Sequence, residues 1–126
     1  MPESTPLLAV VDDDADVRIA LVRLVTSAGF AVESFATGTE FLLSIEHHKP
    51  DCVVLDLHMP GMSGFEVQSA LARGKRTIPV VVITGHDTAD ARHRARELGA
   101  SAYLAKPVDH EALLAAVERA ISGAPT

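Results

Sequence analysis

The chain has 126 residues, 48% hydrophobic and 22% charged, which is the size and balance of one globular domain with its own core. Its formal net charge of -6 argues against direct nucleic-acid binding by the domain as a whole. The only cysteine, Cys52, excludes an internal disulfide, and neither a signal peptide nor an apolar run of membrane-spanning length is present, so we expect a cytoplasmic protein without a membrane partner.

Short apolar runs alternate with longer segments of helical periodicity. The first run, residues 7–11, precedes a segment whose apolar residues share one helical face and which Gly29 closes. The second run, residues 31–35, precedes a helix that opens with a capping-box pattern at Thr37 and Glu40. The first half of the chain therefore predicts two strand–helix units.

The second half continues the same alternation. Its apolar runs are residues 52–56, 80–84 and 102–105. Ser63 stands where the third helix would begin, and Gly99 stands where the fourth would end. A fifth apolar helical face follows the last run. The whole chain thus predicts five successive strand–helix units.

The five repeats predict an α/β fold. Strands that are almost entirely apolar are buried on both faces, as in a parallel sheet covered by helices. We expect a doubly wound, five-stranded parallel sheet of the flavodoxin-like (βα)5 type, with strand order 2-1-3-4-5. One domain would span residues 1–126, with its core from about 7 to 122. Ligands bind such sheets beyond the carboxyl ends of the strands, where the winding reverses.

Polar groups stand at the ends of four predicted strands. Asp12 and Asp13 follow the first strand, Asp56 ends the third, Thr84 ends the fourth, and Lys106 follows the fifth. The second strand ends without such a group, which suits a strand at the edge of the sheet. The order 2-1-3-4-5 would bring the four reactive ends into one cleft.

Clustered aspartates in that cleft need a partner that offsets their repulsion. Asp12, Asp13 and Asp56 suit a hard divalent cation such as Mg²⁺, which binds a few carboxylates and keeps waters and phosphoryl oxygens as its other ligands. We expect Asp14 and Asp16 to cap the first helix instead. The acidic cluster therefore predicts a magnesium site.

Four motifs carry a resemblance to a known family. They are Asp12-Asp13, DLHMPGMSG at 56–64, VVVITGH at 80–86 and AYLAKP at 102–107. In this order the chain resembles the receiver domain of bacterial two-component response regulators over about residues 7–122. The variants of the second and third motifs look most like receivers that carry a helix-turn-helix output domain.

The resemblance implies a phosphoacceptor chemistry. Asp56 would take a phosphoryl group from a phosphohistidine of a sensor histidine kinase or histidine phosphotransfer protein, and Lys106 would pair with a phosphoryl oxygen. The implied Mg²⁺ ligands are Asp13, Asp56, the backbone carbonyl of His58 and, largely through a bound water, Asp12. The domain would act as a signalling component rather than as an enzyme on other substrates.

The resemblance also implies a conformational response. Thr84 would turn to the phosphoryl group, and Tyr103 would rotate into the vacated space. The fourth helix, fifth strand and fifth helix would then contact a downstream protein or a fused output domain, or form a phosphorylation-dependent homodimer. His58 and His86, two residues beyond Asp56 and Thr84, would overhang the acyl phosphate and tune its lifetime.

Two details of the site are also expected. Pro107 would follow a cis peptide bond, as the Lys-Pro pair of the family does. Gly85 leaves room beside Thr84, so that a larger side chain there would block the phosphoryl pocket.

Other kinds of site fit the sequence less well. A calcium loop starting at Asp12 fails, because Val17 stands where glycine is needed and Arg23 where glutamate is needed. A haloacid-dehalogenase-type phosphatase also uses an aspartyl nucleophile after a first strand, but its motif departs at Asp16 and the chain is short for that fold. It is the alternative enzyme hypothesis.

The remaining histidines and a basic segment leave open questions. His47, His48, His93 and His110 lack the spacing of a zinc site and are expected to be solvated. Arg92, Arg94 and Arg96 make the fourth helix locally basic, either as a solvated face or as a contact for an acidic partner or a second copy.

Overall fold

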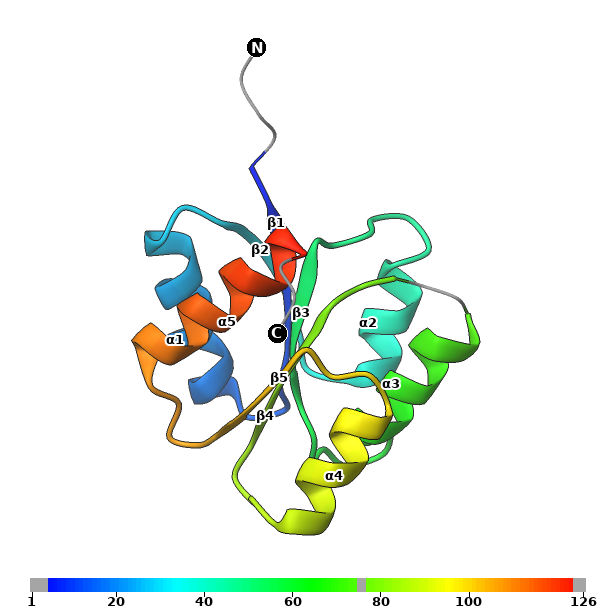
Figure 1. The fold of residues 1–126 in the computed structure, drawn as a ribbon. Helices are drawn as coiled ribbons and strands as arrows, with labels where there is room; N and C mark the ends of the chain where they lie inside the picture. Colours follow the sequence, from blue (N-terminus) through cyan, green and yellow to red (C-terminus); the bar gives the residue numbers. More distant parts are fainter. Residues whose placement is uncertain (1–4, 75–76, 124–126) are drawn as a thin grey trace.

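A computed structural model describes residues 5–74 and 77–123. Within these ranges strands and helices alternate strictly along the chain (Figure 1). The elements are β1 (Leu7–Val11), α1 (Ala15–Ser27), β2 (Ala31–Phe35), α2 (Gly38–Ser44), β3 (Cys52–Asp56), α3 (Gly64–Arg73), β4 (Val80–Thr84), α4 (Ala89–Glu97), β5 (Ala102–Ala105) and α5 (His110–Ser122). Among these residues no helix is long and apolar enough to cross a membrane.

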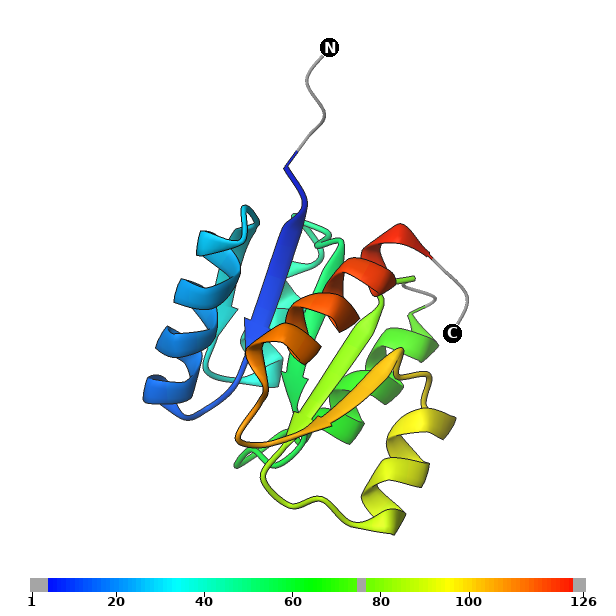
Figure 2. The same cartoon turned by 60° about the vertical axis from the view of Figure 1, so that its left-hand side comes forward.

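The strands form one parallel sheet in the order β2-β1-β3-β4-β5. β1 pairs with β2 on one side and β3 on the other, so the winding reverses between β1 and β3. Helices α1 and α5 cover one face of the sheet, and α2, α3 and α4 cover the other (Figure 1). The predicted doubly wound fold and its strand order are confirmed. Figure 2 shows the carboxyl ends of the strands together at the lower edge of the sheet.

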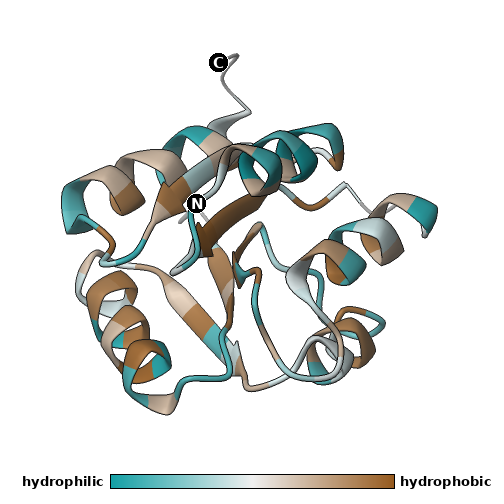
Figure 3. Ribbon diagram, turned by 90° about the horizontal axis from the view of Figure 1, so that it is seen from below, coloured by the Kyte–Doolittle hydropathy of each residue, from teal (hydrophilic) through white to brown (hydrophobic). Residues whose placement is uncertain are grey.

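The core consists of two apolar layers, one on each face of the sheet. Phe41 and Val82 belong to the layer under α2, α3 and α4, whereas Val25 and Leu113 belong to the layer under α1 and α5. β3 and β4 are buried throughout because helices cover both of their faces, while the edge strands β2 and β5 are partly exposed. Figure 3, seen from the carboxyl edge, shows apolar strands between helices with mixed surfaces. Each buried aliphatic side chain stabilises the fold by roughly 1.5–3 kcal/mol.

Each helix begins at a residue whose side chain accepts a hydrogen bond from the first turn. These capping residues are Asp14, Thr37, Ser63, Thr88 and Asp109. Such caps typically contribute about 1 kcal/mol each. Asp16 lies in the first turn of α1, where its charge favours the helix dipole. The predicted cap at Asp14 is confirmed, and Asp16 has the predicted place near the helix start without capping it.

The full capping box lies at α3 rather than at α2. Ser63 Oγ accepts a hydrogen bond from the Glu66 backbone N–H at 3.2 Å, and the Glu66 carboxylate accepts one from the Ser63 N–H at 2.8 Å. At α2 only the first half forms, because the Glu40 carboxylate accepts from the Thr37 hydroxyl instead of the Thr37 backbone. The capping box predicted at Thr37 and Glu40 is therefore only half formed.

The loops at the helix ends follow the predicted turn residues. Gly29 and Gly99 adopt φ values of 100° and 97° just after α1 and α4, a conformation that favours glycine. The Lys106–Pro107 peptide bond is cis, as predicted.

Candidate functional site

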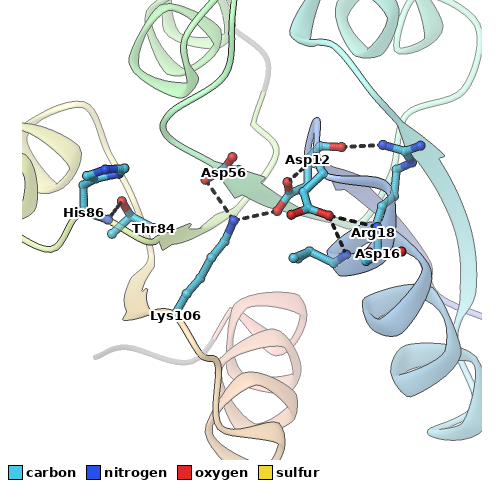
Figure 4. A network of polar contacts seen from close by, with 9 residues as sticks. Asp12, Asp16, Arg18, Asp56, Thr84, His86 and Lys106 are labelled. Carbon is cyan, nitrogen blue, oxygen red and sulfur yellow. Dashed lines mark hydrogen bonds and ion pairs between the residues drawn. The ribbon is translucent and has the colours of Figure 1, made fainter.

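Four strand ends bring polar side chains together at the carboxyl edge of the sheet. Asp12 follows β1, Asp56 ends β3, Thr84 ends β4, and Lys106 follows β5 (Figure 4). Asp12, Asp56 and Thr84 are buried, and the Lys106 side chain is 22% exposed. The predicted convergence of these residues is therefore present in the structure.

The carboxylates form a compact cluster at the point where the winding reverses. Asp12, Asp13 and Asp56 each offer an oxygen, and these three atoms all lie within 4.8 Å of one another. Asp13 is exposed while the other two are buried, so the cluster opens to solvent on one side. Three clustered carboxylate oxygens with access to water fit the ligand preference of Mg²⁺. Across residues 5–74 and 77–123 this is the only group of three or more such side chains.

Asp12 is held by contacts from three directions. Its carboxylate accepts a hydrogen bond from Lys106 Nζ at 2.9 Å and another from the Asp14 backbone N–H at 2.9 Å. Its backbone carbonyl accepts a hydrogen bond from Arg18 Nη1 at 2.7 Å (Figure 4). Sequence reasoning missed Arg18. It lies one turn into α1, a position whose direction toward the site becomes evident only once α1 is placed.

Lys106 is shared by two carboxylates. Its Nζ atom lies 2.9 Å from Asp12 Oδ2 and 3.4 Å from Asp56 Oδ1. Burial lowers the pKa of Lys106, but hydrogen bonds and attraction from both aspartates outweigh that effect, so the pKa is raised overall. The ammonium therefore stays charged and offsets part of the carboxylate repulsion.

Asp56 is a weaker acid than an ordinary aspartate. Burial and the nearby charge of Asp12 raise its pKa from 3.8 to about 6, against opposing contributions from Lys106 and the His58 backbone. A cation bound beside Asp56 would act in the opposite direction and favour the carboxylate.

The fourth strand end supplies a hydroxyl and an open position. Thr84 Oγ1 is buried and accepts a hydrogen bond from the His86 backbone N–H at 3.0 Å. A Cβ atom added at Gly85 would lie 3.9 Å from Lys106 Cδ, which is an ordinary contact. The space beside Thr84 can therefore take a methyl group, and only a longer side chain would compete with Lys106.

The two histidines predicted to overhang the site lie side by side. The ring centroids of His58 and His86 are 4.7 Å apart, with the planes tilted by 46°. Both residues are exposed. Partial desolvation lowers the pKa of His58, and the neighbouring His86 and Lys106 lower it further.

Tyr103 lies in β5, outside the carboxylate cluster. Its hydroxyl oxygen is covered but makes no well-formed hydrogen bond. Burial and the neighbouring Asp87 carboxylate raise the pKa of Tyr103. The guanidinium of Arg92 lies over the ring, with its Cζ atom 5.4 Å from the centroid, and pairs with Asp87 at 2.9 Å.

Other predicted surface residues are partly engaged. His47, His48, His93 and His110 are exposed, and His93 Nε2 lies 3.2 Å from Glu97. Arg94 stacks on the ring of Phe65, with its Cζ atom 4.2 Å from the centroid. The basic side of α4 is therefore not simply solvated, because two of its arginines contact aromatic rings.

A separate groove lies away from these residues. It has a volume of about 660 Å³ and is lined by the segment before β4, the segment between α4 and β5, and parts of α3 and α5. None of the predicted site residues lines this groove.

A family model described as the response regulator receiver domain matches residues 8–118. The chain belongs to this family. The predicted resemblance is thereby confirmed, and the comparisons give no support to the haloacid-dehalogenase-type phosphatase.

Individual relatives agree with this assignment. The chain is 38% identical over 113 residues to the DNA-binding transcriptional regulator NtrC of Salmonella typhimurium, covering 90% of this chain and 24% of NtrC. It is 37% identical over 125 residues to the response regulator protein TmoT of Ectopseudomonas mendocina, covering 99% of this chain and 57% of TmoT. The receiver thus spans about a quarter to just over half the length of these relatives.

Solved structures share the fold. The response regulator StyR superposes with a TM-score of 0.84 at 43% identity, covering 94% of this chain and 60% of that one. FixJ-N superposes with a TM-score of 0.89 at 32% identity, covering 98% of this chain and 99% of that one. The chain is therefore a receiver domain of the two-component response regulators.

Proposed function

We propose that this receiver accepts a phosphoryl group on Asp56 from a phosphohistidine and signals through α4, β5 and α5. The observation that carries this proposal is the convergence of Asp56 with two further aspartates, one ammonium and one hydroxyl at a single sheet edge. Phosphoryl transfer depends mainly on positioning and charge neutralisation, which these groups can provide.

The acidic cluster fits a magnesium ion. Asp13, Asp56 and the backbone carbonyl of His58 would hold it directly, and Asp12 would act largely through a bound water. Bound Mg²⁺ would offset the negative charge on the transferring phosphoryl oxygens. The compact, half-open arrangement of three carboxylate oxygens supports this assignment.

In the transfer, an Asp56 carboxylate oxygen attacks the phosphorus atom and forms the acyl phosphate. The bond from phosphorus to the donor imidazole breaks, and the imidazole nitrogen keeps the electron pair and takes a proton from solvent. Asp56 must be ionised to attack, and with a pKa of about 6 it is mostly ionised at neutral pH. Lys106 would leave Asp12 in part to pair with a phosphoryl oxygen.

The response would begin at Thr84. Its hydroxyl can donate to a phosphoryl oxygen while still accepting from the His86 N–H, so that the loop after β4 moves with it. Tyr103 would then change position in β5.

A sensor histidine kinase or histidine phosphotransfer protein would be the donor. A downstream protein, a fused output domain or a second copy of the chain would read the altered surface.

A labelling experiment tests the proposal. Incubation with acetyl phosphate and Mg²⁺ should add one phosphoryl group to the intact chain, and hydroxylamine should remove it. Asp56→Asn should remain unlabelled, and Asp13→Asn should be labelled far more slowly because it lacks a magnesium ligand. Full labelling of Asp56→Asn, or rates that do not depend on Mg²⁺, would contradict the assignment.

A further inference from the structure

A second polar cluster lies next to the proposed phosphorylation site, between the β4–α4 loop and β5. Arg92 Nη2 donates to both carboxylate oxygens of Asp87, at 3.0 and 2.9 Å. The same guanidinium lies over the ring of Tyr103. Arg92 therefore joins the loop after β4 to the aromatic residue of β5.

Helix α4 depends on such contacts because it buries little apolar surface. Its buried residues are only Ala91 and Ala95. Arg94 on Phe65 ties α4 toward α3, and Arg92 on Tyr103 ties it toward β5. A small apolar face held by arginine contacts is an arrangement that can change at low cost in free energy.

The cluster is linked to the phosphorylation site by a short path. Thr84 Oγ1 accepts the hydrogen bond of the His86 N–H, and Asp87 is the next residue along the chain. A movement of Thr84 toward a phosphoryl group therefore moves the backbone that carries Asp87. The same movement pulls on the ion pair between Asp87 and Arg92.

We propose that Arg92 is a positioning residue for Tyr103, and that the Asp87–Arg92 pair is a latch that opens when Asp56 is phosphorylated. The latch fixes the loop after β4 and covers the Tyr103 ring in the arrangement seen here. This inference rests on the proposed function and adds the element that restrains the response. The covered Tyr103 hydroxyl makes no well-formed hydrogen bond in this arrangement, so no such bond has to break when the side chain moves.

The exposure of the pair sets the size of the expected effect. The Asp87 and Arg92 side chains are 33% and 49% exposed, and a pair of this kind contributes little to overall stability. Its loss should leave the fold intact and should shift the switching equilibrium by roughly threefold to tenfold. Because linkage is reciprocal, removing the latch should tighten binding of a phosphoryl mimic at Asp56.

Tyr103 provides a direct readout, since it is the only tyrosine and the chain has no tryptophan. Beryllofluoride with Mg²⁺ would be titrated into the whole chain, with bound fluoride followed by fluorine NMR and Tyr103 by its fluorescence. Arg92→Gln and Asp87→Asn should each bind beryllofluoride roughly threefold to tenfold more tightly than wild type. Both should already show altered Tyr103 fluorescence before it is added.

The two variants change the net charge in opposite directions, so they separate the latch from long-range electrostatics. Shifts of the same sign support the latch, whereas opposite shifts or none overturn it. Arg92→Lys should recover part of the wild-type behaviour, because an ammonium can pair with Asp87 but has no planar guanidinium to lie over the Tyr103 ring. Arg119→Gln, the same charge change at an exposed α5 position, should match wild type.

Two further arms separate this inference from the proposed function. Adding Arg92→Gln to Tyr103→Leu should leave beryllofluoride affinity unchanged if the latch acts through Tyr103, and a further gain would overturn it. If wild type binds no beryllofluoride at Asp56, the proposed function fails. In that case the fluorescence of unliganded Arg92→Gln still decides whether Arg92 positions Tyr103, and an unchanged spectrum overturns that role.

Discussion

The Lys106 ammonium lies 2.9 Å from the carboxylate of Asp12, a residue with no exposed surface. A buried carboxylate that loses its cation keeps the full cost of desolvation. Lys106 therefore stabilises the metal-free site, in addition to its proposed contact with a phosphoryl oxygen.

Replacing this lysine should destabilise the metal-free protein. We expect Lys106→Gln to lower the free energy of unfolding by about 2 kcal/mol in urea with EDTA, and Mg²⁺ to restore part of the loss by supplying a cation beside Asp12. Lys49→Gln is the control, because the Lys49 ammonium donates to the exposed Thr77 hydroxyl at 3.3 Å. Equal losses in both variants would show that Lys106 has no special role in the site.

The raised pKa of Asp56 predicts how stability depends on pH. The folded pKa of about 6 lies above the ordinary value of 3.8, so the folded state binds a proton more tightly than the unfolded state. The stability linked to this proton is present below pH 4 and is lost as pH rises through 6. Without Mg²⁺, Asp56→Asn should therefore be about 1–3 kcal/mol more stable than wild type at pH 7.5.

That advantage should shrink at low pH. Urea unfolding of both proteins in EDTA should give nearly equal free energies at pH 4, where Asp56 is protonated in the folded state. An advantage that stays constant from pH 4 to pH 7.5 would show that folding does not raise the pKa of Asp56.

Gly64 makes a close approach that predicts a selective cost. A Cβ atom there would meet the carbonyl oxygen of Asp56 and lie 2.8 Å from Leu57 Cα. Gly64→Ala must therefore shift backbone at the end of β3, and we expect it to cost about 1–3 kcal/mol and to slow phosphorylation of Asp56. Gly85→Ala meets only an ordinary contact and should change stability by less than about 0.5 kcal/mol. Thermal unfolding of Gly64→Ala and Gly85→Ala measures the two changes in stability. Equal losses of stability in both variants would contradict the prediction.

The backbone of the site follows from sequence patterns. Apolar runs predicted the strands. The residues at or just after the strand ends identified the site, because parallel strands end at a common edge; they are Asp12, Asp56, Thr84 and Lys106. That edge is a property of topology, so one correct strand order places every group at once. The cis bond before Pro107 came from the family resemblance in the same way.

Contacts between elements could not be read from the sequence. The bond from Arg18 to the Asp12 carbonyl, the clearance at Gly64 and the pair of Asp87 with Arg92 all depend on how helices sit against loops. Long arginine side chains can reach many partners, so periodicity alone does not select one. The helical pattern of α4 identified its basic residues but not the rings that two of them cover.

The histidine pair predicts an effect on the lifetime of the acyl phosphate. The His58 and His86 rings lie 4.7 Å apart on loops beside Asp56 and Thr84, where they can limit the approach of water to phosphorus. We expect His58→Ala and His86→Ala each to speed dephosphorylation by roughly twofold to tenfold. Decay of the phosphorylated proteins between pH 6 and pH 8 measures this, with His48→Ala as the control. Equal decay in all of them would remove both side chains from any role in hydrolysis.

The identity of the acceptor is the central claim, and it can be mapped directly. The wild-type chain would be phosphorylated with acetyl phosphate and Mg²⁺, reduced with borohydride to convert an aspartyl phosphate to homoserine, and sequenced as peptides by mass spectrometry. The account predicts homoserine at position 56 alone, with Asp12 and Asp13 unchanged. Homoserine at position 12 or 13, or reduction at no aspartate after confirmed labelling, would contradict it.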